Sequence, residues 1–143
     1  MGCLYGARLA AQGHQVSLLD NRSDLVAAIN PICALTGLLA NQVSAGAAAD
    51  ALQDRLLEEL LAIVRARGIR LVEADPIASI KEICRTVAVK PSMLQHVEAG
   101  QTTEIDAQNG AAVRAGRDLG IPTPFNEALT LMIKAKIGQA NLH

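Results

Sequence analysis

Residues 50–68 read DALQDRLLEELLAIVRARG, and the spacing of their apolar residues decides the fold class. Apolar side chains recur every three or four positions, which places them on one stripe of an α-helix. The stripe comprises Leu52, Leu56, Leu57, Leu60, Ile63 and Val64, while Gln53, Asp54, Arg55, Glu58 and Glu59 lie off it. Gly68 follows as a stop signal. We therefore expect an amphipathic helix over residues 50–67 that buries one face in a core.

Start and stop signals predict more helices downstream. Asp75 and Pro76 form an N-cap and first-turn pair, and Pro91 ends the segment. Four apolar residues share one face of this helix: Ile77, Ile80, Cys84 and Val87. Three further helices are expected: residues 92–99 before Gly100, a helix that a Thr103-x-x-Asp106 capping box begins and Gly120 ends, and residues 125–137 between Thr123-Pro124 and Gly138. The sequence predicts five or six helices after residue 22.

The N-terminal residues have a different pattern. Residues 4–11 predict a small-residue helix that Gly13 closes, and residues 15–20 predict a short strand. A lone apolar strand leaves an unpaired edge, so we expect residues 16–19 either to drive homo-oligomer formation or to be disordered. The predicted fold is mainly α, with a multi-helix domain over residues 22–143 and an α-β remnant over residues 1–21.

Composition excludes several classes of function. The 143 residues carry 13 Lys+Arg and 14 Asp+Glu, for a net charge of −1, and Tyr5 and Phe125 are the only aromatic residues. A nucleic-acid partner is not expected, because the chain has neither a basic patch nor a platform on which bases stack. Residues 25–49 carry no charge, but Asn30-Pro31 and Gly37 interrupt them. We therefore expect no membrane span.

The cysteines and histidines predict neither disulfides nor a metal site. Cys3, Cys33 and Cys84 are odd in number and widely spaced, and the three histidines lack the spacing of metal ligands. This cysteine usage favours a reducing, cytoplasmic location.

Three segments carry a resemblance to a known family. Residues 92–110 read SMLQHVEAGQTTEIDAQNG, residues 120–126 read GIPTPFN, and residues 30–37 read NPICALTG. Together they closely resemble the C-terminal signature of ketopantoate reductases (2-dehydropantoate 2-reductases), whose pattern is S-M-L-Q-D, T-E-I-D-x-x-N-G and G-I-x-T-P-x-N after an N-P-L-T-A segment. The resemblance implies a helical domain like the C-terminal domain of that family.

The N-terminus resembles the region just inside the family's dinucleotide-binding fold. Gly2 stands at the last glycine of the family's G-x-G-x-x-G turn, which makes it the candidate cofactor-binding residue. The first two glycines and the strand before them are missing, and Asn30 comes only ten positions after Asp20. Asp20 is either a ribose-binding carboxylate or a solvated strand end. The resemblance thus implies a truncated and internally deleted copy that covers about half of a family member.

The same resemblance implies three site residues. Glu104 takes the position of the family's active-site glutamate, Ser92 that of a serine that contacts substrate, and Asn30 that of the asparagine in N-P-L-T-A. Each also has a purely structural interpretation: Glu104 as the first residue of a helix, Ser92 as an N-cap and Asn30 as a turn former. If they bind substrate instead, they should converge on one cleft.

Three positions depart from the family. Arg22 stands where the catalytic lysine is expected, Val26 where a substrate-binding asparagine is expected, and His96 where the family has aspartate. A guanidinium stays protonated, so Arg22 could polarise a carbonyl but is a poor general acid. Any contact that the family's aspartate makes at this position is therefore expected to be lost at His96, or to involve a positive charge in place of a negative one.

The activity that the resemblance implies is NADPH-dependent reduction of 2-dehydropantoate, a small 2-oxo acid, to pantoate in pantothenate biosynthesis. The departures and missing segments predict that this activity is impaired in the chain. The alternative is a non-enzymatic helical binding or dimerisation module, or a pseudogene product. Nicotinamide binding distinguishes these functions.

Overall fold

The computed structural model describes residues 29–71, 74–86 and 88–140, and every regular element in these ranges is a helix. They are α3 (Asn30–Thr36), α4 (Ala40–Val43), α5 (Ala47–Ala66), α6 (Pro76–Thr86), α7 (Ser92–Glu98), α8 (Asn109–Leu119) and α9 (Pro124–Ala140). The mainly α prediction is confirmed for this part of the chain. The expected helix and strand before residue 21, and the boundary between residues 21 and 22, lie outside the described residues.

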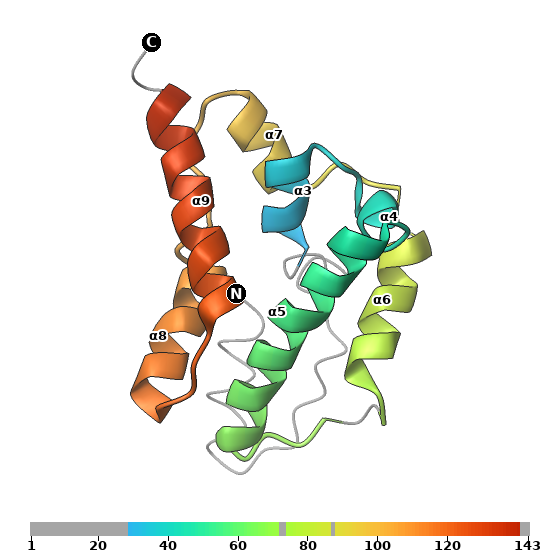
Figure 1. Ribbon diagram of the computed structural model, residues 1–143, viewed down its shortest axis with the longest axis vertical. Coiled ribbons are helices and arrows are strands. Elements are labelled where there is room, and N and C mark those ends of the chain that lie inside the picture. The colour runs from blue at the N-terminus through green and yellow to red at the C-terminus, as the bar shows by residue number, and fades with distance from the viewer. Residues whose placement is uncertain (1–28, 72–73, 87, 141–143) are drawn as a thin grey trace.

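The helices pack around α5, which runs through the middle of the molecule (Figure 1). Helices α8 and α9 pack on one side of α5, and α4 and α6 lie on the other. Helix α3 packs between α7 and α9, so that the segment following residue 29 contacts elements from the C-terminal half. This arrangement brings two of the family-like segments together, residues 30–37 at α3 and residues 92–110 at α7.

The core centres on the short helix α3. Its residues from Asn30 to Ala34 are all buried, and Ile32 meets fully buried apolar side chains from other helices. These include Leu56 of α5, Met93 of α7 and Ile133 of α9. Burial of such side chains is the main stabilising term for a helical domain. Helix α3 ends at Gly37, whose φ of 76° is a left-handed conformation that glycine adopts without strain.

Helix α5 is longer than predicted and is covered on two sides. It begins at Ala47, three residues before Asp50, and Gly68 follows its end with a φ of 71°. The predicted stripe does face the core, but Gln53 and Glu59, expected off the stripe, are also buried. The expectation for these two residues is wrong because α4 and α6 cover one flank of α5 while α8 and α9 cover another.

An ion-pair cluster joins α5 to α6. Lys81 Nζ lies 2.8 Å from Asp50 Oδ2 and 2.7 Å from Asp54 Oδ1. Burial alone would lower the pKa of the Lys81 ammonium, but its hydrogen bonds to both carboxylates outweigh that effect, so the pKa is raised. Asp75 Oδ1 accepts a hydrogen bond from the Ala78 backbone N–H at 3.0 Å, which confirms the predicted cap of α6.

Three local predictions are wrong. The capping box at Thr103 and Asp106 does not form, because Thr103 Oγ1 accepts from Ile105 N and Asp106 pairs with Lys134 of α9. Residues 104–108 form turns, so Glu104 is not the first residue of a helix, and α8 begins only at Asn109. Gly138 does not end α9, which continues to Ala140 because this glycine stays helical.

The number of helices also exceeds the prediction of five or six, since seven occur in the described ranges. The uncharged segment of residues 25–49 contains both α3 and α4. Helix α4 has four residues, which is too short for a periodic pattern to reveal. Among the described residues, no helix is long and apolar enough to cross a membrane.

Candidate functional site

Ser92 and Glu104, twelve residues apart in the sequence, are in direct contact. Ser92 is the first residue of α7, and its hydroxyl donates a hydrogen bond to Glu104 Oε1 at 2.9 Å. The expectation that Ser92 caps its own helix is wrong, because Pro91 occupies the N-cap position and the hydroxyl is turned toward Glu104. The second structural interpretation, in which Glu104 opens a helix, fails as well.

His96 lies beside the other carboxylate oxygen of Glu104. Its Nδ1 is 3.4 Å from Glu104 Oε2, and both side chains are about one third exposed, at 39% for His96 and 31% for Glu104. The imidazole comes from the next turn of α7 after Ser92, so one short helix supplies both contacts. Nδ1 of His96 makes no hydrogen bond among the described residues, so its approach to Glu104 is an ion pair only when the imidazole is protonated.

Asn30 reaches the same region through Gln108. The Asn30 side chain is buried, and its Nδ2 donates to Gln108 Oε1 at 3.5 Å. The Gln108 backbone N–H in turn donates to the Glu104 carbonyl at 3.1 Å, within the turn that carries the carboxylate. Asn30 Oδ1 is buried and finds no hydrogen-bond partner among the described residues. A buried amide oxygen of this kind favours a water molecule or a ligand hydroxyl.

These contacts define the candidate site as Asn30, Ser92, His96, Glu104 and Gln108. Ser92 and Glu104 touch, and Asn30 is joined to their turn by one intermediate residue. Sequence reasoning gave Gln108 no role, and its spacing of four residues from Glu104 is the one signal that could have suggested it. The other candidate residues, Gly2, Asp20, Arg22 and Val26, lie outside the described residues.

The site combines an anionic group with neutral hydrogen-bonding groups. The carboxylate of Glu104 can accept a hydrogen bond from a ligand hydroxyl, and the imidazole of His96 can donate one to a ligand carboxylate when it is protonated. Such a set suits a small, polyhydroxylated acid better than an apolar molecule. Two hollows, of about 670 Å³ beside α5 and about 300 Å³ between α8 and α9, are lined by other residues.

A buried polar network lies next to the turn that carries Glu104. Glu59 of α5 accepts from the backbone N–H groups of Phe125 and Asn126 at 2.8 and 3.0 Å, so it caps the first turn of α9. The Asn126 amide donates to Glu59 Oε2 at 2.6 Å and accepts from Asn109 Nδ2 at 2.9 Å. The network holds α5, α8 and α9 in register and thereby fixes the start of α8 after the Glu104 turn.

Two buried cysteines lie in the core and take no part in the site. Burial raises the pKa of the Cys33 thiol to about 12, and the nearby Cys84 acts in the same direction. Burial also raises the pKa of Cys84, against the effect of a hydrogen bond from Gln53 Nε2 at 3.5 Å. Thiols held in the protonated form are unreactive, so neither is a candidate nucleophile.

The family model described as "Ketopantoate reductase PanE/ApbA C terminal" matches residues 25–137, which is most of the chain. The chain belongs to this family. The matched range includes every residue of the candidate site and all seven described helices except the end of α9. The helical-domain prediction and the resemblance that carried it are confirmed.

Relatives with known names are similar over most of this chain. The 2-dehydropantoate 2-reductase of Aquifex aeolicus is 33% identical over 114 residues, and that of Pyrobaculum aerophilum is 33% identical over 116 residues. These matches cover 76% and 80% of the chain but only 36% and 41% of the two relatives. The chain therefore spans less than half the length of these ketopantoate reductases.

Solved structures agree with the family assignment. A PanE/ApbA family ketopantoate reductase from Ralstonia eutropha is 30% identical and superposes with a TM-score of 0.74, over 97% of this chain and 49% of that one. D-mandelate dehydrogenase, solved with NADH and anilino(oxo)acetate, superposes with a TM-score of 0.73 at 22% identity, over 84% of this chain and 40% of that one. The second likeness shows the shared fold alone.

Proposed function

We propose that the described helices form the substrate side of a 2-dehydropantoate 2-reductase site, in which Glu104, Ser92 and Asn30 bind the 2-oxo acid. The observation that carries the proposal is the contact of Ser92 Oγ with Glu104 Oε1, because the two family-signature residues meet each other and cap nothing. The names of the relatives, 2-dehydropantoate 2-reductase, supply the substrate.

The roles of the residues follow from their chemistry. The Glu104 carboxylate would accept a hydrogen bond from the substrate hydroxyl and would be held in place by Ser92. Asn30 Oδ1 would accept a second hydrogen bond, since it lacks a partner among the described residues. His96 would place a positive charge beside the substrate carboxylate when protonated. These groups orient the acid, which is the contribution that positioning makes to catalysis.

The described residues do not include the turn that binds the pyrophosphate of a dinucleotide cofactor. In the proposed reaction, reduced NADP would supply the hydride that adds to the carbonyl carbon. A site for its pyrophosphate needs a glycine-rich turn between a strand and a helix, and the described ranges contain no such turn. Gly2, the proposed nucleotide-binding residue, is outside them.

Titration with pantoate, the reduced acid, tests the substrate role. Amide chemical shifts of the isotope-labelled chain should change around Asn30, Ser92 and Glu104, with a dissociation constant on the order of 1 mM, the range of a weak contact lacking its second domain. Glu104→Ala should abolish the shifts, and Glu82→Ala, which removes an exposed carboxylate of α6, should leave them intact. Shifts that are absent, or that survive Glu104→Ala, would show that these residues do not bind the acid.

The expected loss of reductase activity is tested separately, by measuring NADPH binding and turnover. NADPH titrated calorimetrically should show no dissociation constant tighter than about 10 μM, and NADPH oxidation with 2-dehydropantoate should stay at the background rate. Tighter binding with measurable turnover would mean that residues outside the described ranges build a competent nucleotide site.

A further inference from the structure

His96 and Glu104 are the two ionisable side chains of the candidate site. Nδ1 of His96 lies 3.4 Å from Glu104 Oε2, while the hydroxyl of Ser92 donates to the other carboxylate oxygen. Nδ1 is buried and makes no hydrogen bond among the described residues, although the imidazole side chain as a whole is 39% exposed. Histidine is the side chain that changes charge between about pH 5 and 8. The net charge of the candidate site therefore depends on one proton at His96.

Two ion pairs account for the other charged side chains of residues 90–108. Lys90, which precedes α7, pairs with Glu98 at the end of that helix. Asp106, in the turns before α8, pairs with Lys134 of α9. Each pair is neutral as a whole, so neither compensates the negative charge of Glu104.

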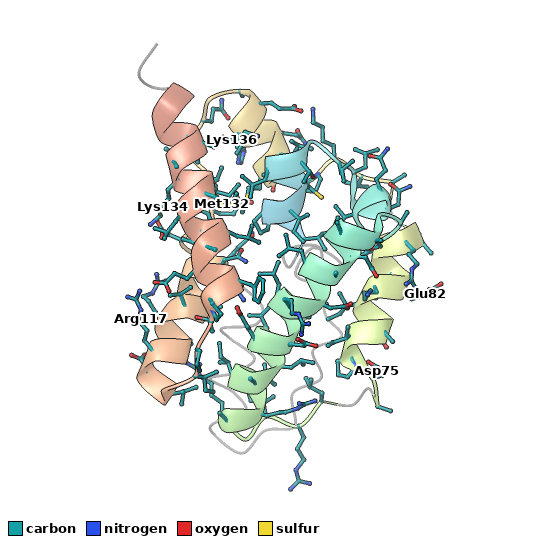
Figure 2. All side chains as sticks on the ribbon, in the orientation of Figure 1. Asp75, Glu82, Arg117, Met132, Lys134 and Lys136 are labelled. Carbon is teal, nitrogen blue, oxygen red and sulfur yellow. The ribbon has the colours of Figure 1, made fainter. Side chains whose placement is uncertain are left out.

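Helix α3, which packs on α7, contributes no charge to the candidate site. It carries no acidic or basic residue, and burial raises the pKa of its Cys33 thiol to about 12, so that the thiol keeps its proton near neutral pH. Lys136 of α9, labelled in Figure 2, donates a hydrogen bond to the Ala34 carbonyl at 3.0 Å and thereby binds the last turn of α3. An imidazolium at His96 is therefore the charge that balances Glu104.

A bound acid changes the number of N–H donors that the candidate site needs. A neutral imidazole has one N–H group, whereas an imidazolium has two. When an acid is bound, Glu104 and the ligand carboxylate are both acceptors, so one N–H of His96 faces Glu104 Oε2 and the second remains for the ligand. With a neutral imidazole, the ligand carboxylate would also meet the uncompensated charge of Glu104. Both the donor count and the charge balance require the protonated ring.

We propose that His96 makes the binding of a carboxylic acid depend on pH, because the acid binds together with one proton on the imidazole. The inference rests on the proposed function, in which the candidate site holds a 2-oxo acid beside Glu104. The proton comes from the buffer and returns to it when the acid leaves. Since the bound acid stabilises the imidazolium, acid binding strengthens as pH falls and weakens as pH rises through the range in which histidine titrates.

Titration with pantoate at two pH values tests this coupling. Pantoate is an anion at both, because a carboxylic acid ordinarily ionises near pH 4. Amide chemical shifts should give a dissociation constant on the order of 1 mM at pH 5.5 and binding at least about tenfold weaker at pH 8. The primary amide of pantoate keeps the hydroxyl groups but carries no charge. It is the matched control ligand and should bind equally at the two pH values.

Two substitutions separate His96 from other sources of pH dependence. His96→Gln removes the titrating ring, so pantoate should bind this variant as weakly at pH 5.5 as it binds the wild type at pH 8. His96→Lys keeps a positive charge at pH 8, so it should restore binding there toward the strength of the wild type at pH 5.5. The Hε1 resonance of His96, assigned by its loss in His96→Gln, should titrate at higher pH with pantoate present than without it. Far-UV circular dichroism checks that both variants fold.

The outcomes distinguish this coupling from the proposed function. Chemical shifts that do not change at either pH would contradict the proposed function and the coupling together. Pantoate binding of equal strength at pH 5.5 and pH 8, or a pH dependence that persists in His96→Gln, would leave the proposed function in place and overturn the role of His96. An amide of pantoate whose affinity changes with pH as much as that of pantoate would overturn it as well.

Discussion

The hydroxyl of Ser92 donates a hydrogen bond to Glu104 Oε1 at 2.9 Å, and this contact ties the first turn of α7 to the turn before α8. Both groups are partly exposed, so the bond competes with water and its net contribution is small. What it fixes is the direction of the carboxylate, with His96 3.4 Å from the second oxygen. The position of the candidate site thus depends on two side chains rather than on a helix cap.

The first prediction measures this contact by a double-mutant cycle. Ser92→Ala, Glu104→Ala and the double variant are unfolded with urea, and the coupling free energy should be about 0.5–1 kcal/mol, as expected for a partly exposed hydrogen bond to a charged group. Exposed pairs give less, so the cycle of Arg55→Ala and Glu58→Ala within α5 is the matched reference. A coupling of zero for Ser92 and Glu104 would mean that the contact does not persist in solution.

The sequence predicted the helices with strong local signals. The stripe of α5, the Asp75 cap of α6 and the Gly68, Gly100 and Gly120 stops all depend on residues close in the chain. The helix expected from Thr103 failed because its local capping signal competed with a distant partner. Lys134, 28 positions after Asp106, binds the Asp106 carboxylate, and residues 104–108 remain in turns.

The candidate site could be predicted only through the family resemblance. Asn30, Ser92 and Glu104 carry no local pattern that distinguishes a binding role from a cap or a turn. The contacts of Glu104 with His96 and of Asn30 with Gln108 join the turns before α8 to α7 and to α3, and periodicity does not reveal such packing. Buried Glu59 was missed for the same reason, because its partners lie 66 and 67 residues away.

The second prediction concerns that buried carboxylate. Glu59→Gln should lower the free energy of unfolding by about 2 kcal/mol, because the amide replaces an acceptor that the first turn of α9 needs with a donor facing other donors. Glu58→Gln is the matched control, since the neighbouring Glu58 is exposed and pairs only with Arg55, and it should change stability by less than about 0.5 kcal/mol. Equal effects of the two changes would show that Glu59 does not cap α9.

The third prediction uses two glycines in helices. A Cβ at Gly116 would lie 2.7 Å from the Ile121 carbonyl and 2.8 Å from Thr123 Cγ2, so Gly116→Ala should destabilise the protein by about 2 kcal/mol by forcing α8 away from the loop to α9. At Gly138 nothing lies within 4 Å, and Gly138→Ala should stabilise the protein by about 0.5–1 kcal/mol. Thermal unfolding measures both. A neutral Gly116→Ala would contradict the close approach of α8 to the Thr123 loop.

The last prediction follows from the buried thiols. In the Cys3→Ser variant, Cys33 and Cys84 should resist a disulfide reagent at pH 8 and react at once after unfolding. Burial raises the pKa of both thiols, and that of Cys33 to about 12.

The same buried thiols should make stability depend on pH. The unfolded thiols ionise near their ordinary pKa of 9.0 while the folded ones keep their protons, so the unfolded state binds fewer protons and the free energy of unfolding falls as pH rises above 9. Lys81, whose pKa is raised from 10.5, contributes only at higher pH, so the loss between pH 9 and 10.5 reports the thiols. Urea midpoints that stay constant over this interval, or native thiols that react as fast as unfolded ones, would contradict their burial.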